Sequence, residues 1–376
     1  MRLLTFTLVL FLLPAGSLGA ANTDKLSMSG DLRLRIESDW DSARSNGTKR
    51  DDRTRARIRA RFGVACEASK RVSFVARLRT GSNESQQSPH ITIADFDGNS
   101  KGDTDLNLDT WYVQYQTDNA GIWLGRKNLP FWRPNEMVLD DDVTPAGIGV
   151  EYSFGDLTIN ASHAKLPAGM QNFTGNVSAT QAIYERQAGA TKLKIAGGVM
   201  RLNADRNDSS NNLLLDNNAS RDYLIWVANL QLQKTFLDRP LRLNFDMIRN
   251  TKSYGVGGND TIASFNRDER NGYVISTRLG DANKRNGWQL GYTFSHIEAL
   301  AVNNSYAQDD WLRWGNATQT RASNFRGSEF RAVWGFSSNL QLVARLYIVQ
   351  GIRDRNPSSL NKEDGKRFRV DLNWRF

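Results

Sequence analysis

Beyond residue 27, apolar side chains recur at every second position in a series of separate rows. In the segment 53–64, RTRARIRARFGV, arginines alternate with threonine, alanine, isoleucine, phenylalanine and valine. Strict alternation of this kind predicts a strand whose two faces have different surroundings. Similar apolar rows occur at 28–36, 72–78, 224–232, 241–247, 288–294, 330–336, 340–348 and 368–376. The pattern therefore favours an all-β protein.

The connections between these rows alternate in length, which predicts antiparallel hairpins with one plain rim and one elaborate rim. At about 9–11 residues for each tilted strand, the chain holds about sixteen strands. The register of 106–115 stays open, because Trp111, Val113 and Tyr115 compete with an alternative apolar row in the same segment. The strands expected at 181–188 and 191–202 have the weakest pattern. Short turns are expected near Cys66, Asp118, Gly155, Asp238, Gly280 and Ser338, and long polar connections at 39–52, 81–105, 127–147, 166–180, 203–220, 251–268, 298–324 and 351–366.

A sheet with one apolar face and one charged face is stable in a membrane only when it closes on itself. Unpaired backbone groups in hydrocarbon cost several kcal/mol each, and closure removes the sheet edges that would carry them. We therefore expect a closed antiparallel transmembrane β-barrel with lipid outside and water inside. The alternative is a large exported β-sandwich or solenoid, whose half-exposed strands also alternate.

The first residues have the layout of a signal peptide for export. Arg2 precedes an apolar run from Leu3 to Leu13, which is followed by Pro14 and a region of small residues. This order of basic, apolar and small residues predicts a cleaved signal over residues 1–21. Residues 22–376 then form a single barrel domain, and the strands begin too early for a separate plug domain. Beyond the signal, no apolar run reaches the roughly 20 residues of a membrane-spanning helix, which excludes a helical transporter.

Several motifs resemble those of a family of bacterial outer-membrane proteins. The ending FRVDLNWRF is similar to the carboxy-terminal signal that the barrel-assembly machinery recognises, and it places Phe368, Val370, Leu372, Trp374 and Phe376 on one side of a strand. The segments GDLRLRIE, RTRARIRARFG, LGRKNLPFW and VLDDDVTPAG together resemble the bacterial putative-porin family, a relative of the sixteen-stranded general porins. The resemblance extends from about Ser29 to the end of the chain.

This resemblance implies a location, a function and a set of partners. It implies a barrel in the outer membrane of a Gram-negative bacterium, with short periplasmic turns, long extracellular loops, and lipid and lipopolysaccharide around it. It also implies a porin, a passive diffusion channel for small hydrophilic solutes, with no enzymatic activity, no cofactor and no metal. Whether three barrels associate, as in general porins, stays open.

The net charge of +9 is concentrated in an arginine-rich part of the sheet. Guanidinium groups stay protonated at physiological pH, so a wall of arginines favours anions in the channel. The alternative is that the arginines are structural and hold a loop or reach lipid phosphates. The predicted basic wall of the pore consists of Arg33, Arg35, Arg53, Arg55, Arg57, Arg59, Arg61, Arg71, Arg77, Arg79, Arg367 and Arg369.

The third long connection, 127–147, resembles in its position the porin loop that folds inward and narrows the channel. We expect Phe131 and Trp132 to hold it against the wall, and Asp140, Asp141 and Asp142 to face the arginines. Opposed charges across a pore create a field that orients dipolar solutes and sets ion preference. The alternative is that the three aspartates lie in an extracellular loop in water.

Other functions receive less support from the sequence. A channel for one specific substrate is the nearest alternative. A barrel enzyme could use Ser295 and His296, but neighbouring strand residues point to opposite faces. The basic composition would suit a nucleic-acid binder, but a signal for export argues against nucleic acid as a partner. The stretch Asp95–Asp105 resembles a calcium loop but lacks the glycine and glutamate that such loops require, so calcium binding there stays open.

Overall fold

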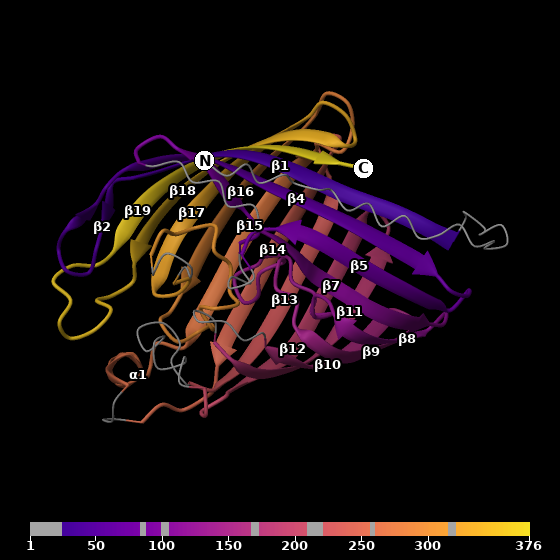
Figure 1. Ribbon diagram of the computed structural model, residues 1–376, viewed down its shortest axis with the longest axis horizontal. Helices are drawn as coiled ribbons and strands as arrows, with labels where there is room; N and C mark the ends of the chain where they lie inside the picture. Colours follow the sequence, from indigo (N-terminus) through magenta and orange to yellow (C-terminus); the bar gives the residue numbers. More distant parts are fainter. Residues whose placement is uncertain are drawn as a thin grey trace, which may run out of the picture.

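The structure is a computed structural model that describes residues 25–82, 88–98, 105–166, 173–208, 221–255, 260–314 and 321–376. The predicted signal peptide, residues 1–21, lies outside the described residues. Figure 1 shows the strands arranged side by side as a tilted ring. Within the described part of the chain, no helix has the length and apolar character needed to cross a membrane.

The main sheet has 17 strands. One of them, β6 (Ile91–Asp95), is short and pairs with β4 above the end of β5, so it lies within a long connection. The other sixteen form the ring, and each is antiparallel to its neighbours. They are β1 (Leu26–Trp40), β4 (Arg53–Glu67), β5 (Val72–Thr80), β7 (Leu106–Gln116), β8 (Ala120–Arg126), β9 (Ala146–Phe154), β10 (Leu157–Leu166), β11 (Gly175–Ala188), β12 (Thr191–Ala204), β13 (Tyr223–Phe236), β14 (Arg239–Asn250), β15 (Asn271–Asp281), β16 (Gly287–Ile297), β17 (Phe325–Gly335), β18 (Leu340–Gly351) and β19 (Asp364–Arg375).

The predicted closed antiparallel barrel of sixteen strands is confirmed, including the two weakest strands, which are β11 and β12. Pairing of β1 with β19 closes the ring. The long connections contain the hairpin of β2 (Ser42–Ala43) and β3 (Lys49–Arg50) and the short helix α1 (Thr261–Phe265). Cys66 belongs to β4 rather than to a turn, because β4 continues to Glu67 before it reverses.

The two faces of the ring differ as the alternation predicts. Leu34 and Phe62 are each 42% exposed although they lie within long strands. Arg35 and Asp371, on the opposite face of β1 and β19, are 2% and 0% exposed. Apolar side chains that stay exposed in regular strands suit contact with lipid, as in membrane barrels.

A β-bulge in β7 explains why two apolar rows compete in that segment. The pairing of β5 with β7 shifts between Arg77 and Leu78, which leaves Asp109 and Thr110 both buried. Leu106 and Leu108 therefore face outward before the bulge, and Trp111 and Tyr115 face outward after it. Each of the two alternatives is correct for one half of the strand, because a bulge inserts one residue and reverses the alternation.

The pairing of β1 with β19, which is the seam that closes the barrel, ends at Gly30 of β1. Gly30 of β1 exchanges two backbone hydrogen bonds of 3.1 Å with Phe376. The aromatic ring of Phe376 lies on Gly30, where an added Cβ would be 2.4 Å from the ring. The last side chain of the chain thus covers the first strand only because position 30 has no side chain of its own.

We expect Gly30→Val to weaken this seam, because the valine displaces the Phe376 ring. Overpacking of this kind costs roughly 1–3 kcal/mol. Gly197→Val is the matched control, since a Cβ at Gly197 meets nothing within 4 Å. Thermal unfolding of the detergent-solubilised barrel, followed by gel mobility, should show a lower transition for the Gly30 variant only. Equal transitions for both variants would contradict the role of the seam.

Candidate functional site

Arginines of neighbouring strands face each other directly on the inner side of the barrel. The register places Arg33 opposite Arg59, and Arg35 opposite Arg57. Arg61 lies opposite Arg79 in the next pair of strands. Like charges in directly opposed positions destabilise a sheet. This wall therefore needs acidic partners close to the arginines.

Acidic residues of the same inner rows supply these partners. Glu37 is fully buried and receives hydrogen bonds from Arg55 and from Arg369, the latter at 2.5 Å. Asp371 binds Arg35 at 2.6 Å. The inner wall is thus a network of ion pairs rather than a purely basic surface. Further pairs join Asp31 to Arg59 and Arg61, each at 2.7 Å, Asp39 to Arg367 at 2.5 Å, and Asp109 to Arg77 at 2.6 Å.

Most of these acids were not among the predicted wall residues, although their spacing in the sequence indicates the same face. Asp31, Glu37 and Asp39 follow the same two-residue period as Arg33 and Arg35. Arginines are so frequent in this part of the sequence that the acidic residues between them were not recognised as partners.

Two of the predicted wall arginines lie away from the centre. Arg71 is in the turn before β5, and its guanidinium is 3.4 Å from the hydroxyl of Tyr115 on the outer face. Its predicted place inside the barrel is therefore wrong, because the turn ends the alternation one residue before β5 begins. Arg53 lies at the rim with the long loops and binds Asp95 at 2.6 Å.

Asp97, in the calcium-like stretch, accepts a hydrogen bond from the backbone of Thr54. Residues 99–104 of the calcium-like stretch lie outside the described residues.

The loop between β8 and β9 runs inward and is fixed to the inner face of strands β11 to β14. The backbone N–H of Trp132 donates to Oε1 of Gln181 on β11 at 2.6 Å, and Nε2 of Gln181 donates to the carbonyl of Trp132 at 2.8 Å. Asn135 donates to Asp246 on β14 at 2.8 Å. Phe131 is 4% exposed and lies over Gly198 of β12. The loop thus rests on strands β11 to β14, whose inner face combines apolar side chains such as Val227 with polar ones such as Gln181 and Asn229.

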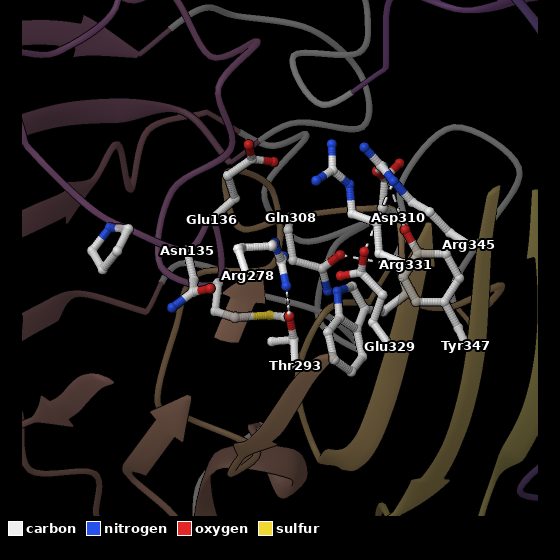
Figure 2. Close-up of a pocket in the computed structure, with 13 residues that line it drawn as sticks. Asn135, Glu136, Arg278, Thr293, Gln308, Asp310, Glu329, Arg331, Arg345 and Tyr347 are labelled. Atoms are coloured by element: carbon white, nitrogen blue, oxygen red, sulfur yellow. Dashed lines mark hydrogen bonds and ion pairs between the residues drawn. The ribbon is translucent and has the colours of Figure 1, made fainter. Parts of the chain in front are cut away.

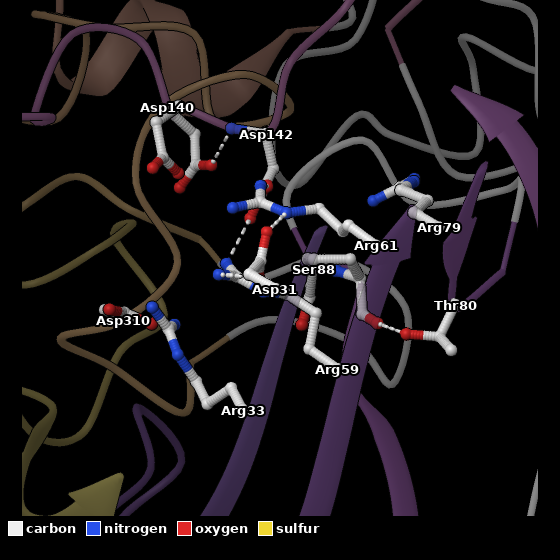
Figure 3. Close-up of polar contacts among 12 residues, drawn as sticks. Asp31, Arg33, Arg59, Arg61, Arg79, Thr80, Ser88, Asp140, Asp142 and Asp310 are labelled. Carbon is white, nitrogen blue, oxygen red and sulfur yellow. Dashed lines mark hydrogen bonds and ion pairs between the residues drawn. The ribbon is translucent and has the colours of Figure 1, made fainter. Parts of the chain in front are cut away.

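The acidic part of this loop reaches back to the arginines of β4 (Figure 3). Asp142 binds Arg61 at 2.8 Å and lies 3.8 Å from Arg59. Asp140 is buried, and its carboxylate accepts a hydrogen bond of 2.8 Å from the backbone of Asp142. Asp141 is exposed to the lumen. The loop therefore bridges the lumen from strands β11 to β14 to the arginines of β4.

A second loop also enters the barrel, which the sequence analysis did not foresee. In the connection 298–324, Tyr306 is 1% exposed. Its backbone carbonyl accepts a hydrogen bond of 2.8 Å from the backbone N–H of Asp140. Asp310 of the same loop contacts Arg369, and it lies 3.1 Å from Arg345 and 3.6 Å from Arg35. The available signal was the apolar content of a supposedly solvated connection, namely Leu300, Ala301, Val302, Tyr306, Trp311, Leu312 and Trp314.

Glu136 and Asp309 have raised pKa values, whereas the pKa of Asp310 is lowered. The charge of Asp141 and then burial raise the pKa of Glu136 to about 8. Burial and then the charge of Asp310 raise the pKa of Asp309 to about 7. Burial alone would also raise the pKa of Asp310, but Arg369, Arg35 and Arg345 outweigh it and hold this pKa well below its usual range.

Glu136, Asp140 and Asp141 form a compact acidic group in the first loop. Their carboxylate oxygens lie within 4.8 Å of one another. Burial raises the pKa of Asp140, and the charges of neighbouring acids raise it further. The mutual repulsion of these acids is relieved when some of them are neutral.

Comparisons with known proteins agree with this architecture. The sequence profile of the family described as "Putative porin" matches residues 43–160. No curated protein matches the chain. Three solved structures share the fold: Pseudomonas putida OprB at high pH (12% identity, TM-score 0.59, 94% of each chain covered), Salmonella typhi OmpF in complex with daunomycin (10%, 0.56, 95% of this chain and 99% of that chain), and the outer membrane channel DcaP of Acinetobacter baumannii (10%, 0.53, 93% and 97%).

These similarities define the class of fold. The resemblance to the putative-porin family is confirmed over the matched segment, and the porin-like barrel extends over nearly the whole chain. Identities near one residue in ten carry the fold alone, so solutes and selectivity must be argued from the residues of this chain.

We expect Gln181→Ala to loosen the first loop, because the substitution removes both hydrogen bonds to the backbone of Trp132. Two such bonds contribute roughly 1–3 kcal/mol. Single-channel current should become noisier, with a larger mean conductance. Gln231→Ala is the matched control, since Gln231 lies on the inner face of β13 and binds Asn244 rather than the loop. Identical currents from both variants would contradict the anchoring role of Gln181.

Ion preference should depend on pH through the raised pKa of Glu136. This carboxyl faces Asp141, Asp310, Arg133 and Arg345. It is neutral below its folded pKa and becomes charged as pH rises through about 8, so the lumen loses net positive charge. The reversal potential in a salt gradient should move toward cations as pH rises.

The Glu136→Gln variant should lose part of this pH-dependent shift. Asp41→Asn is the control, because the hydrogen bond and the charge of Lys366 lower the pKa of Asp41 and keep it ionised throughout the range. A shift of the same size in the Glu136 variant and the wild-type protein would contradict this origin.

Proposed function

We propose that this protein is an outer-membrane porin, a passive diffusion channel for small hydrophilic solutes with a preference for anions. The proposal is carried by one observation. Several arginines of the inner face, among them Arg33, Arg278 and Arg331, form no ion pair with any residue that the structure describes, while most of the predicted wall arginines have acidic partners. Positive charge that the protein does not neutralise attracts anions into the lumen.

The alternative of a barrel enzyme has less support. Ser295 is buried on the inner face of β16, whereas His296 points outward and stacks on Tyr273 with ring centroids 5.0 Å apart. A nucleophile and its base must converge within hydrogen-bond reach. His163 does bind Ser178 at 2.8 Å, but this is a cross-strand pair on the outer face, and no ion pair between His163 and an acid occurs among the described residues.

The outer face supports a position in a membrane with an anionic outer leaflet. Basic side chains follow the outward rows near the rim with the long loops, above the exposed aromatic and aliphatic residues. Phosphate groups of lipopolysaccharide or other lipid would meet them there, because guanidinium and ammonium groups bind phosphate oxygens well. The residues are Lys165, Arg201, Arg249, Arg326 and Lys366.

Assembly and association are also part of the proposal. The outward row Phe368 to Phe376 would serve as the signal for the barrel-assembly machinery. The association of three barrels stays a prediction, and sedimentation of the detergent-solubilised protein tests it.

Planar-bilayer recording under a salt gradient tests the channel and its preference. The wild-type protein should conduct with a reversal potential that favours chloride, and Arg33→Gln should move this potential toward cations. Arg33 donates to Asn373 and forms no described ion pair, so its removal leaves no acid without a partner. Arg71→Gln, in the turn outside the inner wall, should change nothing. A preference of the wild-type protein for cations would contradict the anion preference, and an absence of conductance would contradict the channel.

A further inference from the structure

A cavity of about 210 Å³ lies between the two inward loops and the inner face of strands β15 to β18 (Figure 2). The strand side of this cavity contributes three arginines, Arg278, Arg331 and Arg345. The loop side contributes the apolar residues Met137 and Trp311. None of the three arginines belongs to the wall that the sequence predicted, so the basic surface continues further around the barrel than expected.

Two of these arginines keep free hydrogen-bonding capacity. Nη1 of Arg278 donates to Oγ1 of Thr293 at 3.1 Å and to the carbonyl of Tyr292 at 3.3 Å. Nη1 of Arg331 donates to Oε1 of Gln289 at 2.6 Å. All of these acceptors are neutral. Because a guanidinium group has five N–H donors, both residues can still donate to a solute.

A glycine gives these two side chains their arrangement. Gly291 of β16 lies directly opposite Arg278 on one side and directly opposite Arg331 on the other. A Cβ at position 291 would be 2.7 Å from Cδ and Nη1 of Arg278. The absence of a side chain therefore lets Arg278 lie across β16, toward the strand that carries Arg331.

The acids near the cavity do not cancel this charge. Glu329 lies 3.8 Å from Arg345, and Asp310 binds Arg345 at 3.1 Å and also contacts Arg369 outside the cavity. Glu136 is largely neutral at neutral pH, because its pKa is about 8. The cavity thus holds three cations against two carboxylates that already have partners.

The loop side of the cavity contributes an apolar patch beside polar groups such as Asn135 and Gln308. Met137 and Trp311 are 4% and 5% exposed, and Pro134 lies beside them in the lining. An inorganic ion would leave this surface in contact with water, whereas an organic body would cover it. Arginine binds carboxylates through paired hydrogen bonds, and small-molecule sites combine an apolar lining with a few polar groups that fix orientation.

We propose that this cavity is a solute-binding site for small organic carboxylates with an apolar body. Arg278 and Arg331 hold the carboxylate, and Met137 and Trp311 contact the body of the solute. The inference rests on the proposed channel function and names the class of solute that the channel retains on its way through the barrel.

Block of potassium chloride current by benzoate tests the site. Benzoate should reduce the single-channel current of the wild-type protein in a saturable way. Acetate lacks the apolar body and benzyl alcohol lacks the charge, so each should block at least about tenfold more weakly, which corresponds to about 1.4 kcal/mol. Block by acetate or benzyl alcohol at the concentrations effective for benzoate would overturn the proposed recognition.

Arg331→Gln should weaken the block by benzoate about tenfold, as expected when a charge-assisted hydrogen bond is lost. Arg242→Gln is the matched control, because Arg242 is an arginine on the inner face of β14 that binds Gln233 and does not line the cavity. It should leave the block within about twofold of the wild-type value. Heat-dependent gel mobility establishes that both variants are folded.

Two outcomes separate this inference from the channel function. A wild-type protein that conducts potassium chloride but is not blocked by benzoate, or an Arg331 variant that is blocked like the wild type, would overturn the site and leave the channel intact. An absence of conductance would overturn the channel. In that case calorimetric titration of the solubilised barrel with benzoate tests the site alone: saturable binding that Arg331→Gln weakens would support it, and no binding would overturn it.

Discussion

The structure depends on the need of every strand for a hydrogen-bonded neighbour on both sides. Pairing of β1 with β19 satisfies this need and produces a ring with two separate surroundings. Leu34 and Phe62 can then remain exposed on the outside, while Arg35 and Asp371 meet on the inside. The exposed apolar rows, the buried ion pairs and the inward loops all follow from this closure.

Closure also brings many charged side chains together inside the barrel, and acidic residues there offset the repulsion between the arginines. Facing arginines such as Arg35 and Arg57 would repel each other, but Glu37 and Asp371 stand among them. The two loops add Asp142, which reaches Arg61, and Asp310, which reaches Arg35. The ion pairs that hold the loops inside are therefore also the pairs that reduce the positive charge of the wall. Only arginines without such partners are left to act on solutes.

The sequence was sufficient to predict the barrel, because a period of two residues is a local property that sixteen strands repeat. It was also sufficient to place most of the wall arginines on one face and to indicate the loop with Phe131 and Trp132. It could not reveal that Asp310 lies among Arg35, Arg345 and Arg369, since these residues are far apart in the chain and meet only through closure and loop folding.

Two further features depended on local backbone geometry rather than on composition. The bulge at Asp109 and Thr110 reverses the alternation of β7 within a single strand, so neither apolar row could be chosen for the whole segment. Arg71 shares the spacing of the wall arginines but lies in a turn, where spacing no longer determines direction. Arg278 and Arg331 were not recognised as wall residues, because each is the only basic residue in the inner row of its strand.

The most direct test of the account is labelling of adjacent cysteines on β1 in vesicles, in a Cys66→Ser background that removes the exposed native thiol. Arg33→Cys and Leu34→Cys differ by one residue and should differ in their surroundings. The account predicts that a charged, water-soluble thiol reagent modifies only position 33 and that an apolar, membrane-soluble reagent modifies only position 34. Modification of position 34 by the charged reagent, with position 33 protected from it, would contradict a barrel that has lipid outside and water inside.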